Sequence, residues 1–120
     1  MGGTNSLITS LNGAITVNGT GGSVGVRNRG VTITDGNQIT STGTATMNIT
    51  GTGGNGTDYN QGIELYGANS KITSANGAVI VNGTGGTGTS GSNHGIIFYD
   101  GGQITSTGAA TLNITGTGGL

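Results

Sequence analysis

The sequence predicts an all-β fold, a parallel β-helix (β-solenoid) with three strands in each coil of about 32 residues. The first observation behind this prediction is a repeat of Gly-Thr-Gly-Gly at intervals of 32, 32 and 33 residues, starting at Gly19, Gly51, Gly83 and Gly116. A second motif, Ile-Thr-Ser, recurs with nearly the same spacing, starting at Ile8, Ile39, Ile72 and Ile104. The third observation is a period-two alternation of apolar and polar residues, with no helical spacing of apolar residues.

The expected first strand of each coil contains one apolar column, made of Ile8, Ile39, Ile72 and Ile104. The second strand is expected to contain two columns, made of Ile15, Met47, Val79 and Leu112 and of Val17, Ile49, Val81 and Ile114. The third strand contributes Val31, Ile63 and Ile96 together with Ile33, Leu65 and Phe98. Stacked coils place equivalent residues about 4.8 Å apart in parallel sheets, so these columns fill the interior.

The whole chain is expected to form a single solenoid domain, 1–120, with coils at 5–36, 37–68, 69–101 and 102–120. The fourth coil is incomplete, because the sequence reaches Leu120 before a third strand begins. A second period lies over the first: residues 5–22 are nearly repeated at 69–86, and residues 38–54 at 103–119. The duplicated unit is therefore a block of two coils.

The corners between strands are expected at Gly and Asn. Five Asn-Gly pairs, among them Asn12-Gly13 and Asn76-Gly77, are interpreted as coil corners where Gly supplies a positive φ. The residues before each third strand repeat as Asn-x-Gly, which predicts a corner column of Asn28, Asn60 and Asn93. Such a column can bond its amides along the stack, as Asn ladders do.

Charge and composition exclude several functions. There is no Cys, and the basic residues are only Arg27, Arg29 and Lys71, so we expect no disulfide and no nucleic-acid binding. No apolar run approaches the roughly 20 residues of a spanning helix, so membrane insertion is not expected.

No catalytic, cofactor-binding or metal-binding residue is expected, and the protein is not expected to be an enzyme. Asp35 and Asp100 occupy equivalent corners with Glu64 on the outward face between them, and no Lys or Arg column lies in register. We interpret these acids as solvated turn and surface residues. His94, at a corner, is interpreted as solvated. Residues 53–58 match part of a calcium-binding nonapeptide only once, which favours a plain Gly-rich loop.

Two surfaces are candidates for binding. Thr9, Thr40, Thr73 and Thr105 form an outward column that resembles the Thr arrays of solenoid ice-binding proteins, although Leu11 and Ala75 interrupt the neighbouring column. Thr is also a strong polar strand former, so the column equally suits an ordinary solvated sheet. Tyr66 and Tyr99 are expected to stack outward on the third face, where they would form a carbohydrate or protein contact or a cross-strand pair.

The repeats resemble those of large bacterial exported proteins of the filamentous-haemagglutinin and autotransporter-passenger kind. The resemblance is carried by Gly-Ile-Glu-Leu-Tyr-Gly-(x)4-Ile-Thr-Ser at 62–74 and Asn-Ile-Thr-Gly-Thr-Gly-Gly at 48–54 and 113–119. It implies a right-handed parallel β-helix displayed on the cell surface or outside the cell, as a scaffold or as an adhesin stalk that binds a host or matrix ligand. Because no capping segment is recognised at either end, we expect self-association through the solenoid ends and the formation of fibres.

Overall fold

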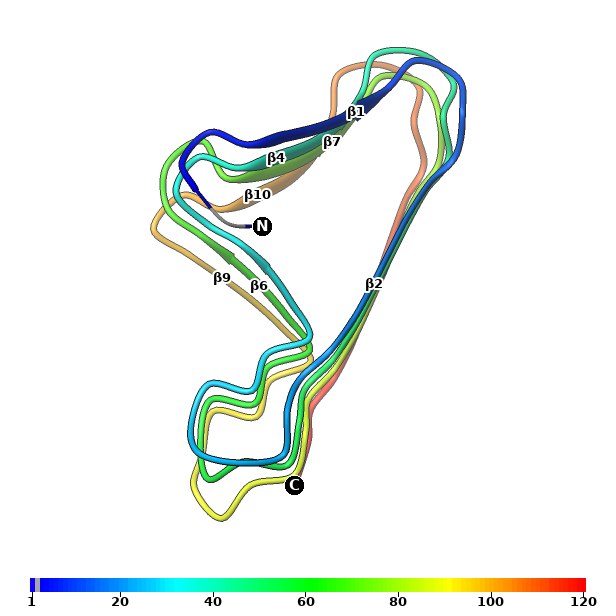
Figure 1. Cartoon of the computed structure of the whole chain (residues 1–120). Helices are drawn as coiled ribbons and strands as arrows, with labels where there is room; N and C mark the ends of the chain where they lie inside the picture. Colours follow the sequence, from blue (N-terminus) through cyan, green and yellow to red (C-terminus); the bar gives the residue numbers. More distant parts are fainter. Residues whose placement is uncertain (2) are drawn as a thin grey trace.

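The chain winds into a stack of parallel coils (Figure 1). The structure is a computed structural model that describes residue 1 and residues 3–120. Those residues contain eleven strands and no helix, and every pairing between strands is parallel. The predicted all-β solenoid with about 32 residues per coil is confirmed.

The strands form three sheets, one on each face of the stack. The first sheet contains β1 (Leu7–Ser10), β4 (Gln38–Ser41), β7 (Lys71–Ser74) and β10 (Gln103–Ser106). The second contains β2 (Ile15–Thr20), β5 (Met47–Thr52), β8 (Val79–Thr84) and β11 (Leu112–Thr117). The third contains only β3 (Val31–Ile33), β6 (Ile63–Tyr66) and β9 (Ile96–Tyr99). The fourth coil thus consists of β10 and β11.

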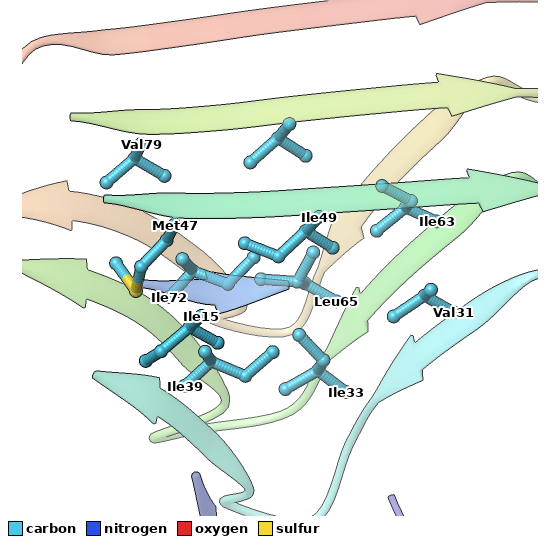
Figure 2. Packing of buried hydrophobic residues seen from close by; sticks show 11 residues of the cluster. Ile15, Val31, Ile33, Ile39, Met47, Ile49, Ile63, Leu65, Ile72 and Val79 are labelled. Atoms are coloured by element: carbon cyan, nitrogen blue, oxygen red, sulfur yellow. The ribbon is translucent and has the colours of Figure 1, made fainter. Parts of the chain in front are cut away.

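Equivalent apolar residues lie directly over one another. Ile39 pairs with Ile72 in the first sheet, and Ile49 pairs with Val81 in the second. Figure 2 shows side chains from the three sheets meeting in the interior of the coils. Burial is complete at Ile39, Ile49 and Leu65 in the second coil. Columns of apolar side chains that run through the stack therefore supply the core that one coil could not make alone.

The same columns are less buried in the last strand of a sheet. Phe98, Leu112 and Ile114 retain 42%, 37% and 44% of their accessible surface, although each pairs in register with a fully buried residue of the third or second coil. The side chains point inward, but no further coil covers them. Their exposure follows from position in the stack rather than from a different direction of the side chain.

Each of the first three coils has two lobes joined at a narrow waist (Figure 1). The three sheets enclose the large lobe, and the segments between the second and third strands, at 21–30, 53–62 and 85–95, form the small lobe. A Cβ on Gly51 would lie 2.1 Å from the carbonyl oxygen of Gly62, so the two chain segments touch through their backbones at the waist. The first Gly of the Gly-Thr-Gly-Gly motif is needed for this close approach. The small lobe accounts for the length of the coil.

Amide side chains fill the small lobe. Asn28 Nδ2 donates to Asn60 Oδ1 at 3.3 Å, and Asn60 Nδ2 donates to Asn93 Oδ1 at 3.0 Å. Asn60 is fully buried and also exchanges hydrogen bonds with the backbone of Gly56. The three residues form an Asn ladder along the stack. It satisfies polar groups in a lobe that contains few apolar residues.

The interpretation of all five Asn-Gly pairs as corners is wrong for two of them. Asn18-Gly19 and Asn82-Gly83 lie inside β2 and β8, where the Gly belongs to the waist. Positive φ angles among the described residues fall instead at other glycines, such as Gly25 and Gly36, and at several residues with side chains. Close backbone approach, rather than turn geometry, explains Gly at the two strand positions.

Candidate functional site

Charged and aromatic side chains gather on the outward face of the third sheet. On β6, Ile63 and Leu65 point into the core, so Glu64 and Tyr66 lie on the opposite face. Register pairs Tyr66 with Tyr99 on β9, and their ring centroids are 4.6 Å apart at an interplanar angle of 32°. The two rings form a tilted stack, and each retains more than a third of its accessible surface.

Glu64 is the most buried charged residue on this face. Only 1% of its surface is accessible, because Arg29 and Tyr99 cover its carboxylate. Arg29 Nη2 lies 3.0 Å from Glu64 Oε1, and the Tyr99 hydroxyl donates to the same oxygen. The expectation that Glu64 is solvated is therefore wrong. No Lys or Arg column lies in register with Glu64, as expected, because its strand partners are Thr32 and Ile97. Arg29 occupies a corner rather than the position paired with Glu64, and only the reach of its long side chain brings the two together.

Arg29 is held in place by a second partner. Its Nε donates to Gln61 Oε1 at 3.0 Å, and Gln61 is 2% exposed. The cluster joins Arg29 of the first coil to Gln61 and Glu64 of the second and to Tyr99 of the third. A buried carboxylate with a charged partner and an additional hydrogen bond is well satisfied. The cluster therefore connects three coils through side chains and fixes the direction of the Tyr99 ring.

Burial raises the pKa of Tyr99 to about 12, and the hydrogen bond and negative charge of Glu64 add to this effect, against an opposing contribution from Arg29. The unperturbed value is 10.0. Tyr99 therefore stays protonated at neutral pH and acts as the donor to Glu64.

Two adjoining hollows lie over this cluster, and we call them together the third-face groove. One has a volume of about 270 Å³ and the other about 410 Å³. Arg27, Arg29 and Tyr99 line both hollows. The smaller one also contacts residues of the small lobe, including Tyr59 and Ser92. The larger one also contacts Tyr66, Asp35 and Asp100, so the predicted acids at equivalent corners do meet around one depression.

Several residues that line the groove have a left-handed backbone. Arg27, Tyr59 and Ser92 have φ angles of 62°, 54° and 67° at neighbouring levels of the small lobe. Asp35 and Asp100 have φ angles of 57° and 49° at the other side of the groove. This conformation is uncommon for residues other than Gly, and least favourable for a bulky one such as Tyr59. The surrounding coils hold it in place.

The predicted Thr column lies on the first sheet. Thr9, Thr40, Thr73 and Thr105 are in register, and hydroxyl contacts join Thr40 to Thr9 at 3.3 Å and Thr73 to Thr105 at 3.1 Å. The hydroxyls thus bond partly to one another. Leu11, 61% exposed, occupies a position beside the column, so the face does not extend as a regular lattice of Thr alone.

The remaining candidate residues from the sequence, His94 and residues 53–58, do not line either hollow of the groove. His94 is exposed at its corner, and its carbonyl accepts a hydrogen bond from Gly62 N. Residues 53–58 lie in the small lobe, where Asn60 bonds the backbone of Gly56. Within residues 1 and 3–120, no group of three or more His, Cys, Asp or Glu side chains is arranged to hold a metal ion.

Comparisons with known proteins found no similarity: no family model, no curated protein and no solved structure matches the chain. The part of the chain that the structure describes has no helix that is both long and apolar enough to cross a membrane.

Proposed function

We propose that this protein is a structural segment of an extracellular β-solenoid, and that its coils stack end to end with those of a second copy. The observation that carries the proposal is the uniform parallel register of the first two sheets across all four coils. A coil in such a stack makes the same contacts with the coil above as with the coil below. The architecture can therefore lengthen without a change of geometry.

The two ends of the stack are complementary in sequence. The sequence of the fourth coil at 103–119 nearly repeats that of the second coil at 38–54. The sequence of the first coil at 5–22 is likewise nearly repeated in the third coil at 69–86. A second copy's β1 and β2 can therefore pair with β10 and β11 as β7 and β8 pair with β4 and β5. In that arrangement the half-exposed Ile114 would be covered by Val17 of the second copy, as Ile49 is covered by Val81.

The third sheet would leave a gap at this junction, because β9 has no counterpart in the fourth coil. At the opposite end of the stack, Met1 lies against the outer edge of β3, because its amino group donates to the carbonyl oxygen of Thr32 at 3.1 Å. Pairing through two sheets is head-to-tail and does not close on itself, which gives linear assemblies.

Negative-stain microscopy and sedimentation over a concentration series test the stacking. We expect rods of increasing length at high concentration. Ile114→Lys places a charge on the end face and is expected to prevent assembly. Thr115→Lys is the matched control, because Thr115 lies next to Ile114 on β11 and pairs with the exposed, outward-facing Asn82 of β8. Monomers at the highest soluble concentration, or equal assembly by both variants, would contradict the proposal.

A ligand-binding role on such a scaffold, as in an adhesin stalk, is the second candidate. The third-face groove favours it, because a scaffold needs no hollow lined by Arg, Tyr and Asp. The extracellular location rests on the resemblance of the repeats to exported bacterial proteins. Protease digestion of intact cells that carry the protein would test it: digestion without lysis is expected, and protection until lysis would contradict it.

A further inference from the structure

We propose that the third-face groove binds a neutral saccharide, with ring faces on Tyr66 and Tyr99 and hydroxyl groups on the side chains of Arg27, Asp35 and Asp100. This inference goes beyond the structural role, since stacking of coils does not depend on the groove.

Around the groove, equivalent positions of successive coils hold different residues. The first strand of every coil contains Ile-Thr-Ser, and the second strand of every coil ends in Gly-Thr. At the third sheet, by contrast, the paired outward positions hold Thr32, Glu64 and Ile97. The corner before it holds Arg29, Gln61 and His94 at the middle position of Asn-x-Gly. The apolar core columns do not depend on these outward and corner residues, so their identities are free to serve another role.

The chemically distinctive residues of the chain gather at the same groove. The chain has three Tyr, and all of them, Tyr59, Tyr66 and Tyr99, line the groove. Both Arg residues line it as well. Thr, Asn and Gly are the commonest residues of the chain. A concave site with a few convergent polar groups beside aromatic rings is the usual form of a small-molecule site.

The groove supplies the two kinds of contact that a sugar needs. Tyr66 and Tyr99 keep 37% and 38% of their surface accessible, and an aromatic face packs against the apolar C–H face of a sugar ring. Carboxylates accept hydrogen bonds from hydroxyls, and a guanidinium donates to them. Asp35, Asp100 and Arg27 line the groove with exposed side chains. The ring of Tyr99 is fixed in advance by Glu64, which lowers the entropy cost of binding.

Charge argues for a neutral ligand. Arg29 and Glu64 neutralise each other, which leaves Arg27 against Asp35 and Asp100. An anionic polysaccharide would meet a net negative surface, which disfavours its association. The volumes of about 270 and 410 Å³ lie near the lower end of the range for small-ligand pockets, about 300–1,000 Å³. A short oligosaccharide that occupies both hollows fits these dimensions.

Titration calorimetry and Tyr proton shifts in NMR spectra test this inference. The neutral probes are cellotetraose, maltotetraose and fully N-acetylated chitotetraose, with tetragalacturonate and a heparin tetrasaccharide as anionic counterparts. We expect saturable binding of at least one neutral probe and shifts confined to the groove. Tyr66→Ala should weaken that binding by about tenfold or more, and Tyr66→Phe, which keeps the ring, should change it by less than about threefold.

Leu11→Ala, which removes an exposed apolar side chain from another face, is the control and should leave binding unchanged. Circular dichroism of each variant shows whether the sheets are intact, and Asp100→Asn provides a second, conservative test at the groove, with weaker binding expected. Absence of saturable binding to all three neutral probes, binding of the anionic probes alone, or binding unaffected by both Tyr66→Ala and Asp100→Asn would overturn the inference. None of these outcomes bears on end-to-end stacking, which is measured separately.

Discussion

Asn28 and Asn60 are separated by 32 residues in the chain, and their side-chain amides bond to each other at 3.3 Å. Asn60 continues the contact to Asn93 at the next level. The small lobe is thus organised around a polar column, whereas the large lobe is organised around apolar ones. Both columns depend on the same event, the placement of each coil over the last.

Asn60→Ala should destabilise the fold by about 1–3 kcal/mol, because it leaves buried polar partners unsatisfied. Asn60 is fully buried and bonds to Asn93 and to the backbone of Gly56. The midpoint of urea unfolding, followed by circular dichroism, measures the change. Asn82→Ala is the control, because Asn82 is exposed on β8, and a shift below about 0.5 kcal/mol is expected there. Similar shifts for the two variants would show that the ladder does not stabilise the fold.

Gly51→Ala should destabilise the fold by about 1–3 kcal/mol or more, because the added Cβ overpacks the waist. The Cβ would lie 2.1 Å from the carbonyl oxygen of Gly62. Gly116 occupies the same motif position in the fourth coil, yet the nearest atom to its Cβ would be 3.5 Å away. Gly116→Ala should therefore be neutral or stabilising by about 0.4–1 kcal/mol. Thermal unfolding of both variants decides the matter, and equal losses would contradict the close approach at the waist.

Ile49→Ala should cost about 2–5 kcal/mol, the usual range for a large residue truncated in a core. Ile114→Ala should cost clearly less in the monomer, because Ile114 keeps 44% of its surface accessible whereas Ile49 keeps none. Urea unfolding at low concentration, where stacking is minimal, compares the two. A larger loss for Ile114 would mean that the fourth coil, and not the second, holds the centre of the core.

Alkaline pH should destabilise the fold through Tyr99. Its pKa is raised to about 12 in the folded protein from 10.0, so the unfolded chain loses this proton first as the pH rises. The stabilising contribution is complete below pH 10 and is lost as the pH rises through about 12. Absorbance of the phenolate in a pH titration measures the pKa directly.

Glu64→Gln removes the negative charge next to Tyr99 and should lower its pKa toward the ordinary value. Burial is the larger cause of the shift and remains in the variant, so the pKa should fall only in part. Tyr99→Phe identifies the titrating group, because the absorbance change near pH 12 should disappear. A Tyr99 that titrates at its ordinary pKa in the unsubstituted protein would contradict the burial of its hydroxyl against Glu64.

The large lobe could be predicted from the sequence because its apolar residues recur at a regular interval. Ile8, Ile39 and Ile72 hold equivalent positions in the sequence, and the sheets pair them in that register. The Asn column could be predicted for the same reason. The exposure of apolar side chains in the last strand of a sheet was harder to anticipate. Phe98 and Ile114 occupy the same sequence positions as buried residues of other coils, and they differ from those residues only in having no further strand beside them.

The contacts of Glu64 with Arg29 and Tyr99 could not be predicted from the columns of equivalent residues in successive coils. Register pairs Glu64 with Thr32 and Ile97, and pairs no position of the third sheet with Arg29. The contact between Arg29 and Glu64 arises diagonally, from a corner of one coil to a strand of the next, and depends on side-chain length. One signal was present in the sequence: both Arg residues and Tyr59 precede third strands, and Tyr66 and Tyr99 are the last residues of third strands.

A disulfide cross-link within the chain tests the stacking of coils most directly, because the protein has no Cys of its own. Asn18 and Thr50 are partners in adjacent coils, and Asn18 and Asn82 are two coils apart. Neighbouring parallel strands lie about 4.8 Å apart, within reach of a disulfide, whereas twice that distance is not. Mild oxidation of dilute protein, followed by mass spectrometry, should give an intrachain disulfide in Asn18→Cys/Thr50→Cys and none in Asn18→Cys/Asn82→Cys. A disulfide in the second variant and none in the first would contradict the winding of the chain.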